Sequence, residues 1–145
     1  MNPQNAAKMT RIVAYGFIAF AIVWGLAPYS AISEPSRLLL DLLSLPFGDA
    51  PANLTQSEMW LSSIGAGLVA AICIMLLGIV VPAVQNGDKK IIKTTIWAFA
   101  VWYIVDSVGS IAAGVPSNAF FNAILLVAIL IPLITVKFEQ QSHQD

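Results

Sequence analysis

Hydrophobic residues fall into four long runs along the chain, separated by short polar or proline-containing connections. The runs cover residues 12–32, 57–84, 91–115 and 118–136. A helix needs about 20 apolar residues to cross the roughly 30 Å hydrocarbon core of a bilayer, and each run has about that length or more. The pattern therefore predicts an all-α integral membrane protein, a four-helix bundle that forms a single membrane domain over residues 1–145.

Composition agrees with this class of protein. Of the 145 residues, 58% are hydrophobic and 10% are charged, whereas soluble domains average about 45–50% apolar and about 25% charged residues. The net charge of −1 provides no basic field of the kind that attracts nucleic acid. We therefore expect the lipid bilayer as a partner, and no nucleic acid.

Capping and turn residues mark where the spans begin and end. Thr55 and Glu58 have the spacing of a capping box at the start of the second span, and Pro82 near its far end can kink or end that helix. The segment 114–117, Gly-Val-Pro-Ser, ends the third span and starts the fourth, which predicts a tight helical hairpin. The polar tail, residues 137–145, is expected to be disordered.

The first run follows two basic residues, Lys8 and Arg11, as the apolar core of a signal peptide does. It is long enough to cross the bilayer, and no cleavage site with small residues at the required positions follows it. We therefore expect an uncleaved first span.

A short amphipathic segment lies between the first two spans, at residues 34–46. Its leucines fall on one side of a helix, whereas Arg37, Asp41 and Ser44 recur at helical spacing on the other. The segment is too short and too charged to span, which leaves two placements open. It is either an interfacial helix in the headgroup plane or a loop helix that folds back onto the bundle.

The distribution of basic residues predicts the orientation of the chain. With four spans, the N-terminus, the second connection and the tail share one side, and the other side carries only Arg37. The basic residues on the shared side are Lys8, Arg11, Lys89, Lys90, Lys93 and Lys137. Since loops rich in Lys and Arg remain in the cytoplasm, we expect both termini to be cytoplasmic and the amphipathic segment to face outside.

One acidic residue, Asp106, lies within the third span. It is about nine residues from the expected outer end, which at 1.5 Å per residue is roughly 13 Å deep and close to the bilayer centre. An acid there costs about 2.5–3.5 kcal/mol on insertion scales. A stripe of branched aliphatic residues suited to lipid lies on a different face of the helix, at Val101, Ile104, Val108, Ile111 and Val115. We therefore expect Asp106 to face other helices.

The residues around Asp106 suggest an intramembrane polar site and a helix contact. Side chains one turn away and on the fourth span can hydrogen-bond its carboxyl group, namely Tyr103, Ser110, Asn118 and Asn122. Small residues let helix backbones approach closely. We expect the second and third spans to pack through two such series, Ser63, Gly67 and Ala71 on the second and Gly109 and Ala113 on the third.

No catalytic set or cofactor motif accompanies Asp106. The single cysteine, Cys73, excludes an intrachain disulfide, and the single histidine, His143, lies in the tail, so we expect no metal site and no cofactor. Asp106 has two interpretations. It is a proton or cation site in a transport pathway, or an acid that fixes helix register or pairs across an oligomer, and the absence of a relay of other acids favours the second.

The sequence favours a small multi-pass protein without enzymatic activity, a structural or accessory subunit that forms a homo-oligomer or joins a larger membrane complex. The alternatives are a proton- or cation-coupled transporter or channel protomer that uses Asp106, and a membrane enzyme acting on lipid or quinone through Asp106, Tyr103 and Ser110. Across the whole chain and in layout alone, four hydrophobic helices with an outer amphipathic segment resemble the small four-helix DoxX-like bacterial membrane proteins. We expect the bacterial inner (plasma) membrane as the location.

Overall fold

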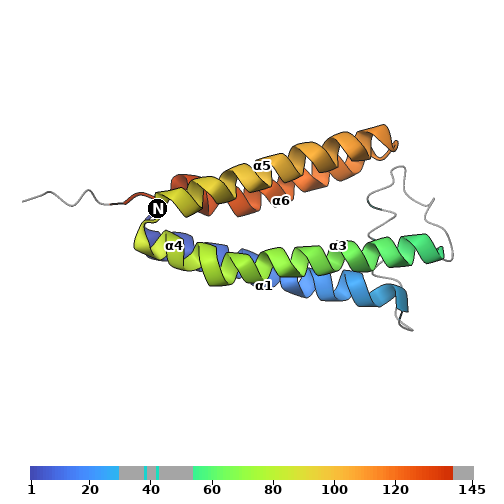
Figure 1. Ribbon diagram of the computed structural model, residues 1–145, viewed down its shortest axis with the longest axis horizontal. Helices are drawn as coiled ribbons and strands as arrows, with labels where there is room; N and C mark the ends of the chain where they lie inside the picture. Colours follow the sequence, from blue (N-terminus) through green and yellow to red (C-terminus); the bar gives the residue numbers. More distant parts are fainter. Residues whose placement is uncertain (30–37, 39–41, 43–53, 139–145) are drawn as a thin grey trace, which may run out of the picture.

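The computed structural model describes residues 1–29, 38, 42 and 54–138, and its regular elements there are all helices. Helix α1 spans Pro3–Leu26 and is followed by the short 3₁₀ turn η1, Ala27–Tyr29. The second span consists of α3 (Gln56–Met75), the π-helical segment η2 (Leu76–Val80) and α4 (Val81–Asn86). Helices α5 (Lys89–Ala112) and α6 (Pro116–Thr135) form the third and fourth spans (Figure 1).

Four helices within the described residues are long and apolar enough to cross a membrane, which are α1, the continuous stretch from α3 to α4, α5 and α6. Large apolar side chains cover their outer surfaces. On α5, the expected lipid-facing residues Val101, Ile104, Val108 and Ile111 are each more than half exposed. Such a surface is unfavourable in water and favourable in lipid. The structure therefore indicates a multi-pass membrane protein, and the prediction of four helices with the length and composition of membrane spans is confirmed.

The first span begins earlier than predicted, at Pro3 rather than near residue 12. The Asn2 side chain accepts a hydrogen bond from the Asn5 amide at 2.8 Å, and proline is well suited to the first helical position because no amide donor is needed there. Lys8 and Arg11 lie at exposed positions within this helix. The polar residues before the apolar run therefore extend the helix instead of preceding it.

The first span also ends earlier than predicted. α1 stops at Leu26 instead of continuing to residue 32, and Pro28, which lacks an amide hydrogen, lies in the 3₁₀ turn that follows. The amphipathic helix expected at 34–46 and the disorder expected for the tail, 137–145, fall almost entirely outside the described residues.

Pro82 does not end the second span. Proline removes one helical hydrogen bond, and its ring crowds the carbonyl group one turn earlier. Here the turn before Pro82 widens into the π-helical segment η2, after which α4 continues to Asn86. Figure 1 shows α3 and α4 as one continuous rod.

The helices lie in two antiparallel pairs. α1 lies along α3 and α4, and α5 lies along α6 (Figure 1). The two pairs meet at the α4 end, where α1 contacts α6 and where η2 and α4 contact α5. Buried apolar side chains from all of these helices form the core there, including Ala7, Leu76, Val84, Ile92, Ile129 and Leu133.

The start of α1 and the end of α6 lie at the same end of the molecule. The Met1 backbone nitrogen donates a hydrogen bond to the Thr135 carbonyl, and the Lys137 amide donates to the Met1 carbonyl at 2.8 Å. The Phe138 ring lies beside Gly87 in the turn between α4 and α5. The start of α1, the end of α6 and the α4–α5 turn therefore share one end, as an even number of spans requires.

Small residues bring α1 close to α3. A Cβ atom added at Gly25 would lie 2.8 Å from the Ala66 Cβ, and one added at Gly65 would overlap the Trp24 ring. Ser63, which we expected to face the third span, donates a hydrogen bond from its hydroxyl group to the Tyr29 hydroxyl at 3.1 Å. The small residues of the second span that make a close helix contact are therefore directed to the first span.

The other residues that we expected at a contact between the second and third spans do not form one. Gly67 and Ala71 on α3 and Gly109 and Ala113 at the end of α5 are all exposed. The physical reason is that α3 uses the adjacent face, with Ser62 and Ala66 buried, for its contact with α1. A shift of one residue turns a helix by about 100°, so neighbouring small-residue series point in different directions.

Candidate functional site

The carboxylate of Asp106 lies between α5 and α6 and accepts hydrogen bonds from three of the described side chains. The Ser110 hydroxyl, one turn further along α5, donates to Oδ1 at 3.1 Å. From α6, the Asn118 side-chain amide donates to the same oxygen at 3.1 Å, and the Asn122 amide donates to Oδ2 at 2.9 Å. Asn118 also donates to the Ser110 Oγ at 2.7 Å. These four side chains form one connected group, which we call the Asp106 network.

Helical spacing and a tight turn produce this geometry. Asp106 and Ser110 are four residues apart on α5, and Asn118 and Asn122 are four apart on α6, so each pair lies on one face of its helix. Gly114 adopts the left-handed conformation, with φ 82°, in the turn between the helices. This turn sets the first residues of α6 opposite the last residues of α5. The Asp106 network therefore belongs to a single helical hairpin.

The network is shielded on the α6 side and lies nearer the helix end than expected. Asn122 is only 6% exposed, and the other three residues are half-buried. α5 ends at Ala112 instead of residue 115. Asp106 is therefore roughly 9 Å from the end of its helix at 1.5 Å per residue, instead of the roughly 13 Å expected.

Tyr103 is the predicted site residue that the structure leaves out of the network. It is half-buried, and among the described residues its hydroxyl group forms no hydrogen bond with Asp106. Side chains on an α-helix lean toward the N-terminus. Ser110 therefore leans back toward Asp106, whereas Tyr103, which precedes Asp106, leans away from it.

Ser107 is a polar neighbour that the sequence analysis did not single out. Its Oγ is buried and has no hydrogen-bond partner among the described residues. A buried hydroxyl group without a partner costs about 1–3 kcal/mol. Being next to Asp106 in the sequence, Ser107 points about 100° away around the helix, which takes it off the face of the network. A serine within an apolar run carries no sequence signal that distinguishes this state from a bonded one.

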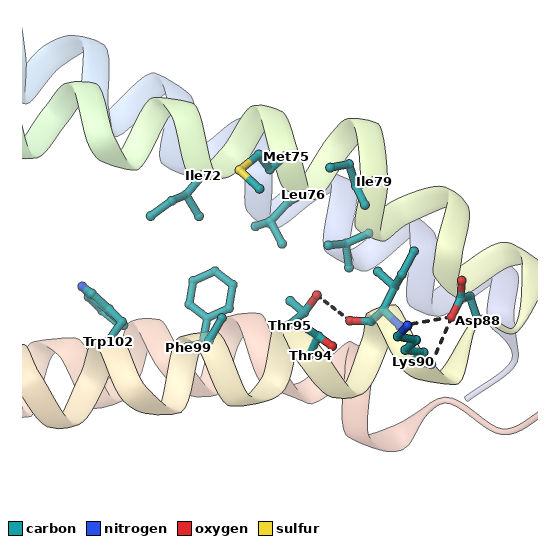
Figure 2. A pocket seen from close by; sticks show the side chains of 13 residues that line it. Ile72, Met75, Leu76, Ile79, Asp88, Lys90, Thr94, Thr95, Phe99 and Trp102 are labelled. Atoms are coloured by element: carbon teal, nitrogen blue, oxygen red, sulfur yellow. Dashed lines mark hydrogen bonds between the residues drawn. The ribbon is translucent and has the colours of Figure 1, made fainter.

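A cavity between the second and third spans was also missing from the sequence-based expectations. It has a volume of about 580 Å³ and lies between the α3–η2 part of the second span and α5 (Figure 2). Its walls are mainly apolar and include Leu76, Phe99 and Trp102, with Lys90 at one end. The sequence pattern assigns each of these residues only to a span or a turn, because cavities arise from how helices diverge.

Neither a metal site among the described residues nor a related protein indicates what the chain does. Within the described parts of the chain, no group of three or more His, Cys, Asp or Glu side chains could hold a metal ion. Comparisons with protein-family models, with curated proteins and with solved structures found no match to this chain. The Asp106 network, the exposed helix faces and the cavity are therefore the features of the structure that bear on function.

Proposed function

We propose that this protein is a non-enzymatic structural or accessory subunit that associates in the membrane with copies of itself or with a larger complex. The observation that carries the proposal is the engagement of both Asp106 carboxylate oxygens by donors from the same hairpin. An acid bound in this way fixes the register of α5 against α6. General acid–base catalysis needs a group that is positioned on a substrate, whereas this carboxylate is positioned on its own helices.

The two alternative functions have less support. A coupling carboxylate exchanges its partners for an ion or water during transport, and at Asp106 this exchange would break contacts of 2.9–3.1 Å with three side chains. A lipid- or quinone-directed enzyme would use Asp106, Ser110 and Tyr103 together, but Tyr103 lies outside the network. The network therefore favours the structural interpretation of the acid.

Exposed small residues support the association with another helix. A Cβ atom added at Gly67 or Gly109 would meet no described atom within 4 Å. Glycine inside a helix costs about 0.5–1 kcal/mol relative to alanine, and no close contact offsets this cost here. Ala71 and Ala113 follow four residues later and are exposed too. Each helix thus presents a small-xxx-small pair, the pattern along which membrane helices approach each other closely.

Substitution of these glycines by leucine tests the proposal. In a mild detergent, we expect Gly67→Leu or Gly109→Leu to reduce the molecular mass measured by light scattering or to remove a copurifying membrane protein. Gly16→Leu is the matched control, because Gly16 is also exposed with nothing within 4 Å but has a phenylalanine, Phe20, four residues later. A wild-type protein that is monomeric and copurifies with nothing would overturn the proposal. Ion flux in proteoliposomes that Asp106→Asn abolishes would support the transporter instead.

We also propose that both termini are cytoplasmic and that the protein lies in the bacterial inner membrane. The orientation is supported by the lysine-rich α4–α5 turn, which lies at the same end as the start of α1 and the end of α6, since basic loops stay in the cytoplasm. Single cysteines introduced into a Cys73→Ser background test it. In spheroplasts, a membrane-impermeant maleimide should label Gln56→Cys and leave Asn86→Cys unlabelled until the cells are lysed. The reverse labelling pattern would refute the orientation.

A further inference from the structure

The cavity between the second and third spans has the size and lining of a site for a hydrocarbon chain. Its volume of about 580 Å³ lies within the range of ligand pockets, about 300–1,000 Å³. Ile72, Leu76 and Ile79 line the wall formed by the second span, and Phe99 points toward this wall from α5 (Figure 2). The rings of Phe99 and Trp102 meet edge to face, with centroids 6.3 Å apart. The long walls are therefore apolar.

One end of the cavity is cationic. Asp88 and Lys90 line this end next to the α4–α5 turn (Figure 2). The Asp88 Oδ1 caps α5 by accepting hydrogen bonds from the backbone amides of Lys90 (3.0 Å) and Ile91 (3.1 Å). The Lys90 ammonium group pairs with no described carboxylate. Lys89 and Lys93 lie close by in the sequence, so positive charge exceeds negative charge at this end.

The length of the cavity matches one leaflet of a bilayer. Along α5, the distance from Lys90 to Trp102 is roughly 18 Å at 1.5 Å per residue. Half of a hydrocarbon core of roughly 30 Å is about 15 Å. A molecule with its charged group at Lys90 would therefore extend its chain to Trp102 near the middle of the bilayer.

From this geometry we infer that the cavity binds an anionic phospholipid, with one acyl chain between α5 and the second span and the phosphate at Lys90. The apolar walls contact the acyl chain and separate it from the surrounding lipids. Met75 on the wall is flexible enough to adapt to the shape of the acyl chain. The positive end attracts the anionic headgroup. This lipid would fill the space that the two helix pairs leave between them.

Lipid titrations of the purified full-length chain test the headgroup contact. Native mass spectrometry measures binding of phosphatidylglycerol and of phosphatidylcholine with the same acyl chains, in detergent micelles. We expect wild type to prefer phosphatidylglycerol and Lys90→Ala to bind it about five-fold more weakly, the effect of one basic group near the surface. Lys8→Ala is the matched control, because it removes the same charge from an exposed position on α1 that does not line the cavity, and it should retain the preference. Equal losses in both variants would overturn the inference, since they indicate general surface attraction.

A second variant tests the position of the acyl chain. Ala98 lines the cavity and is exposed, so Ala98→Phe fills the space without disturbing the core. We expect it to lower phosphatidylglycerol binding and to reduce quenching of Trp102 fluorescence by brominated acyl chains, measured by difference against Trp102→Phe. Ala19→Phe, at an exposed position on α1, should change neither quantity. If Ala98→Phe melts like wild type and binds the lipid equally well, the chain lies elsewhere and the inference is wrong.

Discussion

Replacing Asp106 by leucine puts a larger apolar side chain in its place and removes the acceptor of three of the network's four hydrogen bonds. The insertion cost of an acid in lipid does not decide the outcome, because the unpacked helices already lie in the membrane and carry the same residue. The substitution instead weakens the pairing of α5 with α6. Asn122, at 6% exposure, and Ser110 would be left without their acceptor, and Asn118 would keep only the Ser110 Oγ.

The magnitude follows from the number of bonds that are lost. Interhelical hydrogen bonds in membrane proteins average about 0.6 kcal/mol and reach about 1.7 kcal/mol, since the unfolded state also finds partners. With two bonds crossing to α6 and one within α5, we expect Asp106→Leu to lower the free energy of unfolding by about 2 kcal/mol. If Asp106 only destabilised the fold, Asp106→Leu would instead raise the free energy of unfolding.

A double-mutant cycle isolates the contact between Asp106 and Asn122. Unfolding by sodium dodecyl sulfate in mixed micelles, followed by circular dichroism, gives the stability of Asp106→Leu, Asn122→Leu and the double variant. We expect the double variant to be more stable than the sum of the single effects predicts, by about 0.6–1.7 kcal/mol, because replacing both partners leaves neither unpaired. Ser107→Ala is the neighbouring control and should be at least as stable as wild type, since its hydroxyl group has no described partner. Additive single effects, or an Asp106→Leu variant as stable as wild type, would show that these hydrogen bonds do not stabilise the pairing of α5 with α6.

Three further predictions use the same unfolding assay. Gly25→Ala brings a methyl group to 2.8 Å from the Ala66 Cβ on α3 and should lower the free energy of unfolding by about 1–3 kcal/mol through overpacking. Gly16→Ala on the same helix is the control and should be neutral or stabilising. Equal effects of the two substitutions would contradict the close α1–α3 contact. Thr55→Ala removes the capping box with Glu58 and should cost about 1 kcal/mol, with faster amide exchange in the first turn of α3. Gly87→Ala forces a Cβ atom into the left-handed conformation, φ 74°, and should cost about 1–2 kcal/mol, so an unchanged stability would mean that the turn is different in solution.

The sequence was sufficient to predict the features that depend on local pattern. Run length identified the four spans, and the Thr55 capping box appears as predicted, with the Glu58 amide donating to the threonine hydroxyl at 3.3 Å. The Gly114 turn and the asparagines after it placed donors opposite Asp106, because tight hairpins bring the adjoining helix ends together. These features need only the helical period and a turn.

Features that depend on which helix lies beside which could not be predicted in the same way. The second span carries small residues on more than one face, and nothing in its pattern distinguishes Ser62 and Ala66, which are buried, from Gly67 and Ala71, which are exposed. In lipid, helices gain little from burying apolar surface against each other, so hydropathy does not select the contact face. The π-helical response to Pro82 likewise depends on the helix continuing to favourable contacts in the core at Val84.

Different interactions join the two helices within each pair, so the contribution of each pair to the free energy of unfolding can be measured separately. α1 and α3 meet through a close contact at Gly25, near the end of the first span, whereas α5 and α6 are joined by the Asp106 network near their connecting turn. The pairs contact each other at the opposite end, around Val84 and Leu133. Mutations that share no contacts add to within about 0.3–0.5 kcal/mol. Gly25→Ala and Asp106→Leu should therefore be additive in a double variant, and a larger coupling would show that the pairs also meet near the network and that the arrangement of Figure 1 does not persist in the membrane.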